Sequence, residues 1–198
     1  MGKKSNWKRF TALNQRKKIS RKQKTAIGRK GKRKQNNRIK TALKTSIKTQ
    51  KGLSCKRILS LTKGFLHFLG CFAQDTVSKL QFRSKPCFFL VNIDSTGSPG
   101  SHWLAIGLFQ TTIEVFDPLG FEIFKWSQIP CSLLTFIHTH SVNRKLFLSD
   151  KVQSNTSTLC GFYCLFYVLN RPFMSFSQIM SCFSTTLTDN DKLLTLLF

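Results

Sequence analysis

Cys160 lies where a polar segment, residues 149–158, gives way to an apolar run, residues 159–169. A run that is apolar on all sides predicts a helix in the middle of the core, so the Cys160 sulfur is expected at a helix N-terminus. The helix dipole and the free N–H groups favour a thiolate there, and a thiolate beside a histidine is a nucleophile. Gly161, which follows, leaves the approach to the sulfur uncrowded.

A histidine and a carboxylate are expected to meet at one end of a β-hairpin. If residues 102–109 and 112–116 are its two strands, the start of the first lies beside the end of the second. His102 and Asp117 stand at those ends, symmetric about positions 109 and 110. The turn lacks the usual Gly or Asn, so the register is left open by a residue or two. A carboxylate orients an imidazole and makes it more basic, which prepares a general base.

An amide side chain completes the set. Gln153 lies seven residues before Cys160, and its amide together with the Cys160 backbone N–H could stabilise an oxyanion. Taken singly, Cys160 fits core packing, His102 a satisfied strand residue and Asp117 an ordinary turn former. The four together, in this order, indicate nucleophilic chemistry. Cys164, one turn further along the expected helix, is interpreted as core packing.

Hydrophobic patterning predicts the elements that must position these residues. Strands are expected at residues 87–93, 102–109 and 112–116 and form an antiparallel meander, with a loop at residues 94–101. Helices are expected at residues 159–169, 176–183 and 189–198. A short apolar segment covers residues 65–72, and residues 133–137 and 145–148 fit either a strand or a helix.

Charge divides the chain of 198 residues into two regions. Residues 1–63 hold 23 of the 32 Lys and Arg and no Asp or Glu, whereas residues 64–198 hold the other 9 and all 8 acidic residues. Without acidic partners the like charges repel each other and no helix-stabilising ion pairs form. We therefore expect a basic arm, residues 1–63, that is disordered when free. It is joined at Lys63–Gly64 to a nearly neutral domain, residues 64–198, that is long enough to bury a core.

The basic arm is expected to bind the phosphate backbone of DNA, with an affinity that falls steeply with salt. A nuclear import signal fits the same residues, and a solvated tail without a dedicated partner remains the alternative. The densest basic clusters consist of Arg16, Lys17, Lys18, Arg29, Lys30, Lys32, Arg33 and Lys34.

Several classes of protein do not fit the sequence. No apolar run approaches the roughly 18–20 residues of a membrane span, and the N-terminus lacks the apolar stretch of a secretory signal. The seven cysteines are scattered and form no C-x-x-C pair, which argues against a zinc ribbon. We expect a reducing compartment with mostly buried thiols, no metal and no membrane association.

The domain resembles the adenovirus-type cysteine protease family (the adenain family) and its relatives in Polinton/Maverick-like elements. More distantly it is similar to the SUMO-specific proteases. The resemblance covers roughly residues 65–175. The blocks that carry it are Phe68-Leu69-Gly70, residues 85–92, His102-Trp103-Leu104-Ala105, residues 116–121, Gln153 and Cys160-Gly161-Phe162-Tyr163-Cys164.

The resemblance implies an α+β, papain-like fold with an antiparallel sheet and a central buried helix. It implies Cys160 as the nucleophile, His102 as the base, Asp117 as the orienting carboxylate and Gln153 as the oxyanion-hole side chain. The adenovirus branch usually has Glu where this chain has Asp117, and the other two branches use Asp. Trp103 is expected to pack beside His102. No cofactor is expected, although DNA and a short activating peptide are implied by the resemblance.

The leading interpretation is a cysteine endopeptidase that processes viral or mobile-element precursor proteins while it is associated with DNA. Its partners would be protein or polyprotein substrates, cut near small residues, and DNA bound through the arm. The virion and the host nucleus are its expected locations. Two alternatives stay open: a SUMO-protease-like isopeptidase, and a DNA-packaging core protein with an inactive protease-like domain. The natural substrate, the cleavage motif and the oligomeric state are left open.

Overall fold

The computed structural model describes residues 52–82, 85–121 and 129–198. The predicted disorder of the basic arm falls almost wholly on residues 1–51, outside the described residues. The eight basic residues predicted to contact nucleic acid lie outside them too.

Five strands form one sheet, in chain order from edge to edge. They are β1 (Phe68–Ala73), β2 (Cys87–Asn92), β3 (Trp103–Leu108), β4 (Thr112–Phe116) and β5 (Lys145–Leu148). Strands β2, β3 and β4 are antiparallel, which confirms the predicted meander.

The expectation of a wholly antiparallel sheet is wrong at both edges, because β1 pairs with β2 and β5 pairs with β4 in parallel. Parallel neighbours need a crossover connection instead of a hairpin turn. The 3₁₀ helix η1 (Val77–Lys79) lies in the first connection, and helix α4 (Cys131–Ser141) lies in the second.

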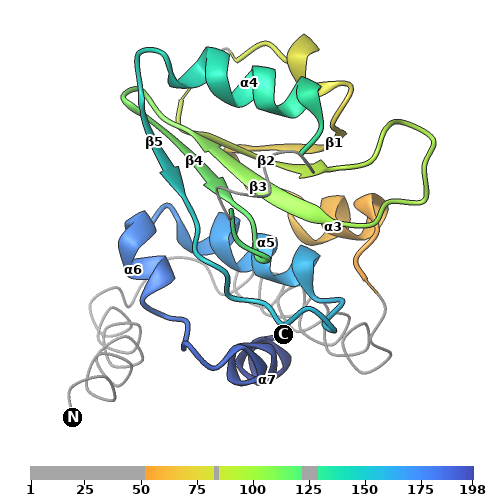
Figure 1. Ribbon diagram of the computed structural model, residues 1–198, viewed down its shortest axis with the longest axis vertical. Helices are drawn as coiled ribbons and strands as arrows, with labels where there is room; N and C mark the ends of the chain where they lie inside the picture. Colours follow the sequence, from red (N-terminus) through yellow and green to blue (C-terminus); the bar gives the residue numbers. More distant parts are fainter. Residues whose placement is uncertain (1–51, 83–84, 122–128) are drawn as a thin grey trace, which may run out of the picture. The chain divides into compact units, whose positions relative to one another are not determined.

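Both faces of the sheet are covered, so its central strands are apolar on both sides. Phe89 belongs to one core cluster with Phe136 of α4. Phe88, the neighbouring residue, contacts Tyr167 of helix α5 (Cys160–Asn170) on the opposite face, and Phe116 of β4 stacks on the same Tyr167 ring. Figure 1 shows this arrangement, with α4 on one side of the sheet and α5 on the other.

The two segments that patterning left undecided have different structures. Residues 133–137 belong to helix α4, in which Leu133, Phe136 and Ile137 are buried. Their spacing is that of one helical face. Residues 145–148 form strand β5.

The three predicted C-terminal helices are present. Helix α5 is buried from Cys160 to Val168, as expected for a run that is apolar all round. Helix α6 (Phe176–Met180) ends three residues before the predicted limit, and α7 (Leu187–Leu197) begins two residues earlier than predicted. None of the helices in the described ranges is long and apolar enough to cross a bilayer.

The folded domain begins before the expected boundary at Lys63–Gly64. Ser54 caps helix α3 (Cys55–Leu61), which packs beside β1, and Leu53 and Ile58 are buried. Of the 23 Lys and Arg among residues 1–63, only Lys56, Arg57 and Lys63 lie after residue 51, so the basic average of the arm comes from the residues before this stretch. That average concealed the apolar helix face that ties residues 53–62 to the domain.

Candidate active site

The hairpin of β3 and β4 brings His102 and Asp117 together. His102 immediately precedes β3 and Asp117 immediately follows β4, so the two residues stand at the same end of the hairpin. Ala105 pairs with Phe116, which places the centre of the pairing one position later than predicted. The side chains still meet, with His102 Nε2 2.7 Å from Asp117 Oδ1.

Backbone and hydroxyl groups fix the position of Asp117. The Leu119 N–H donates to Asp117 Oδ1 over 2.9 Å. The Ser149 hydroxyl accepts from the Asp117 N–H at 2.8 Å and donates to the Asp117 carbonyl at 2.7 Å. Ser149, which follows β5 and is buried, was missed by the sequence analysis. Only the parallel pairing of β5 with β4 brings it to Asp117, and no local sequence signal predicts that pairing.

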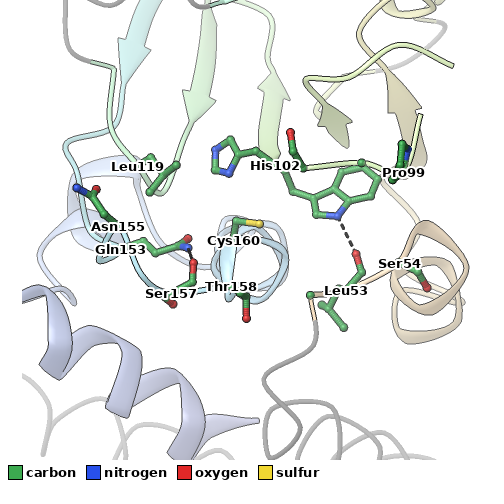
Figure 2. Close-up of a pocket in the computed structure, with 14 residues that line it drawn as sticks. Leu53, Ser54, Pro99, His102, Leu119, Gln153, Asn155, Ser157, Thr158 and Cys160 are labelled. Atoms are coloured by element: carbon green, nitrogen blue, oxygen red, sulfur yellow. Dashed lines mark hydrogen bonds between the residues drawn. The ribbon is translucent and has the colours of Figure 1, made fainter. Parts of the chain in front are cut away.

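Cys160 is the first residue of α5, one position after the predicted start, so it lies at the N-terminus of the helix as expected. Two contacts seat this end of the helix beside Trp103. The Cys164 thiol donates to the Trp103 carbonyl over 3.3 Å, and a Cβ added at Gly161 would lie 3.4 Å from Trp103 Cδ1. Because Trp103 follows His102, these contacts also bring the imidazole close to Cys160 (Figure 2), near enough for Cys160 to influence the pKa of His102. Cys164 itself is fully buried, so its interpretation as core packing is confirmed.

The charge on His102 follows from its two neighbours. Burial alone would lower the pKa of the ring, because it disfavours the charged form. The hydrogen bonds to Asp117 and to Cys160, and the negative charges of both groups, outweigh burial and raise the pKa of His102 to about 10. The ring is therefore an imidazolium at neutral pH. A positive ring beside a sulfur atom is the arrangement that stabilises a sulfur anion.

Gln153 is held by the turn that follows Asp117. The carbonyl of Pro118 accepts from the backbone N–H groups of Gln153, at 2.8 Å, and of Val152, at 2.9 Å. The buried Gln153 amide donates through Nε2 to the Ser157 carbonyl over 2.6 Å. Its Oε1 has no hydrogen-bond partner among the described residues. Nε2 carries two hydrogens and donates one of them to Ser157, so the second remains for a ligand.

The site opens into a cavity of about 530 Å³ that Cys160, His102 and Gln153 line together. This volume falls within the usual range of ligand sites. In Figure 2, Gln153 lies on one side of Cys160, Leu53 lies on the other, and His102 lies above. Asp117 is not part of the lining, so three of the four predicted residues face the cavity and the fourth supports His102.

The available chemistry consists of the Cys160 sulfur, an imidazolium with a carboxylate partner, and a free amide N–H. These are the components of acyl transfer through a covalent intermediate. All seven cysteines are free thiols. Within the ranges that the structure describes, no group of three or more His, Cys, Asp or Glu side chains is placed to hold a metal ion.

No family model matches the sequence, and no curated protein matches it. Among solved structures, the chain is similar to the crystal structure of the ASFV pS273R protease, with a TM-score of 0.42 and 18% sequence identity. The similarity covers 75% of this chain and 68% of that chain. A likeness at this level leaves the function to be argued from the site itself.

Proposed function

We propose that the chain is a cysteine peptidase in which Cys160 is the nucleophile and His102 the base. One observation carries the proposal: His102 bonds Asp117 through one ring nitrogen and interacts with the thiol at the start of a buried helix. A carboxylate fixes the orientation of the ring and stabilises its charged form. The ring in turn activates the sulfur.

The reaction begins with attack of the Cys160 sulfur anion on the carbonyl carbon of a peptide bond, which forms a C–S bond. The carbonyl oxygen becomes an oxyanion, which accepts hydrogen bonds from the Cys160 N–H and from the free amide hydrogen of Gln153. The Cys160 N–H is available because the first residues of a helix have no intrahelical acceptor.

Collapse of this intermediate breaks the C–N bond. His102 gives its proton to the departing amine, and an acyl group remains on the sulfur as a thioester. Water then attacks the thioester while His102 takes a proton from it. The C–S bond breaks, the acid product leaves, and Cys160 and His102 return to their starting states. Asp117 keeps the ring in place throughout, held by Ser149 and by the Leu119 N–H.

The finer proposals are supported by the sequence. The order of the His, Asp, Gln and Cys motifs supports an endopeptidase of the adenovirus type that processes viral or mobile-element precursor proteins. The basic clusters within residues 1–51 support association with DNA, and hence a place in the virion and the host nucleus. Confinement to DNA would raise the effective concentration of the enzyme near substrates bound to the same DNA.

The proposal is tested by comparing the peptidase activity of the wild-type full chain with that of variants at Cys160, His102 and Cys131. Cys160→Ala is expected to abolish cleavage of Gly-containing peptides and labelling by a thiol-directed probe at that position. His102→Ala is expected to lower kcat/KM by a factor of about 10²–10⁴, the usual contribution of a general base. Cys131→Ala, which removes an exposed thiol on α4, is the matched control and should cleave like the wild type.

Cleavage that persists in Cys160→Ala, or Cys160 labelling that His102→Ala leaves unchanged, would contradict the proposal. A matched pair of substrates, a linear Gly-Gly peptide and a SUMO conjugate, separates endopeptidase from isopeptidase activity. Cleavage of the conjugate alone would favour the isopeptidase.

A further inference from the structure

The segment Gly52–Ser54 forms one wall of the cavity that contains Cys160. Leu53 is only 4% exposed, and its carbonyl accepts the indole N–H of Trp103 over 2.7 Å in a buried hydrogen bond. Ser54 accepts from the Arg57 N–H as the cap of α3. Leu53 is therefore fixed between the sheet on one side and a capped helix on the other.

Leu53 also packs directly against the helix that carries Cys160. A Cβ added at Gly161 would lie 2.9 Å from Leu53 Cβ and 3.4 Å from its Cδ1. Real Cβ atoms do not approach so closely, so Leu53 can occupy this place only because residue 161 is Gly. The leucine is thus seated against the residue immediately after Cys160.

The two sides of the cavity differ in character. Gln153, Asn155 and Ser157 lie on one side of Cys160, whereas Leu53 lies on the other (Figure 2). Trp103, which is hydrogen-bonded to the Leu53 carbonyl, lines the cavity as well. A peptide whose carbonyl reaches the Cys160 sulfur would lie between these two sides, with a side chain next to the apolar one. A large side chain there would have to displace the Leu53 side chain from its packing against Gly161, while the backbone of Leu53 stays held by the Trp103 indole.

We propose that Leu53 is a specificity-determining residue, which sets the size limit for the substrate side chain that lies beside Gly161. The proposal rests on the proposed peptidase function. It assigns a role in the site to a residue that charge composition placed in the basic arm.

A panel of peptides tests the role of Leu53 in the full chain. Each peptide carries either Ala or Leu at one position, from four residues before the scissile bond to two residues after it. The wild type is expected to discriminate against Leu at one of these positions. Leu53→Ala should relax that discrimination about tenfold or more, because a missing methylene in an apolar subsite has an effect of this order. Leu59→Ala, which changes a side chain exposed on the adjacent helix α3, is the control and should leave every ratio unchanged.

Truncation of a buried leucine can destabilise a fold, so circular dichroism accompanies the kinetics. If Leu53→Ala does not fold, Leu53→Val provides the test and should relax the same position by a smaller factor. Ratios that stay unchanged in a folded Leu53 variant, while cleavage still depends on Cys160, would overturn the role of Leu53 and leave the peptidase intact. Failure of the wild type to show any Cys160-dependent cleavage would remove both proposals.

Discussion

Both ends of helix α5 lie against the hairpin of β3 and β4 and contact ionisable groups there. The hydrogen bonding is complete at one end and incomplete at the other. At the C-terminal end, Arg171 donates to both carboxylate oxygens of Glu114, at 2.6 and 2.7 Å, and Tyr167 donates to Glu114 Oε2 at 2.8 Å. Burial and the charge of Glu114 raise the pKa of Tyr167 well above its usual value, so its hydroxyl stays protonated and donates. Glu114 is 1% exposed, and both of its carboxylate oxygens accept hydrogen bonds.

At the N-terminal end the bonding is incomplete. His102 and Asp117 are paired, but Gln153 Oε1 has no hydrogen-bond partner in the described ranges. The Cys160 sulfur lines a cavity instead of a packed interior. A buried polar group without a partner costs stability, and groups kept in that state are those that a substrate can complete. The hydrogen bonds of Glu114 therefore stabilise the fold, whereas the groups around Cys160 are left available for a substrate.

The largest expected effect is the loss of folding stability when Glu114 is removed. Glu114→Ala should lower the free energy of unfolding by about 3–5 kcal/mol, the usual cost of removing one partner of a buried ion pair. The guanidinium of Arg171 cannot lose its proton, so it would remain charged and unpaired. Urea unfolding followed by circular dichroism measures the change.

Asp117→Ala is the matched variant at the other end of the helix. It should cost clearly less stability than Glu114→Ala, because the orphaned His102 can become neutral, and it should nevertheless remove most of the activity. An equal loss of stability at both ends would break the contrast between the two networks.

A second effect concerns pH. The pKa of His102 in the folded chain, about 10, lies above the ordinary value of 6.5, so binding of a proton to His102 stabilises the fold. This contribution is fully present below about pH 6.5 and is lost as the pH rises through 10. We expect the wild type to exceed His102→Gln in unfolding free energy by about 2 kcal/mol at pH 6, as for a hydrogen bond to a charged group.

The difference between wild type and His102→Gln should shrink steadily towards pH 10. Urea unfolding of both proteins at several pH values checks this trend. A difference that stays constant between pH 6 and pH 10 would contradict the raised pKa of His102.

The smallest effect is expected at Ser149. Ser149→Ala removes both hydrogen bonds to the Asp117 backbone and should cost about 0.5 kcal/mol of stability per bond, the lower end of the usual range. Because Asp117 then orients the ring less well, kcat should fall more than KM changes, and Ser149→Thr should restore much of it. Ser181→Ala, which removes an exposed hydroxyl on the surface, is the control for both readouts. Full activity in a folded Ser149→Ala would exclude this positioning role.

The sequence predicted the parts of the fold that depend on local pattern. The apolar run after Cys160 could only be a buried helix, and the hairpin was indicated by two short β-favouring segments whose ends carry His102 and Asp117. A one-position difference in register did not matter, because both residues stand just outside the paired strands.

The sequence did not predict the contacts between segments that are far apart in the chain. The parallel edges and the approach of Ser149 depend on crossover connections, whose destinations leave no local trace. The apolar run of residues 133–137 was too short to distinguish a helix from a strand. The role of Leu53 was hidden by averaging, since its neighbours in the first 63 residues are mostly basic or polar.

The placement of Gln153 has a consequence for residues outside the cavity. Asn190 of α7 donates to the carbonyl of Val152, next to Gln153, and Asp191 accepts from Ser154 in the same loop. The oxyanion side of the site therefore depends on contacts from α7, although no residue of that helix lines the cavity. On the proposed function, substitutions in α7 would change the rate of the reaction from a distance, through the loop that carries Gln153.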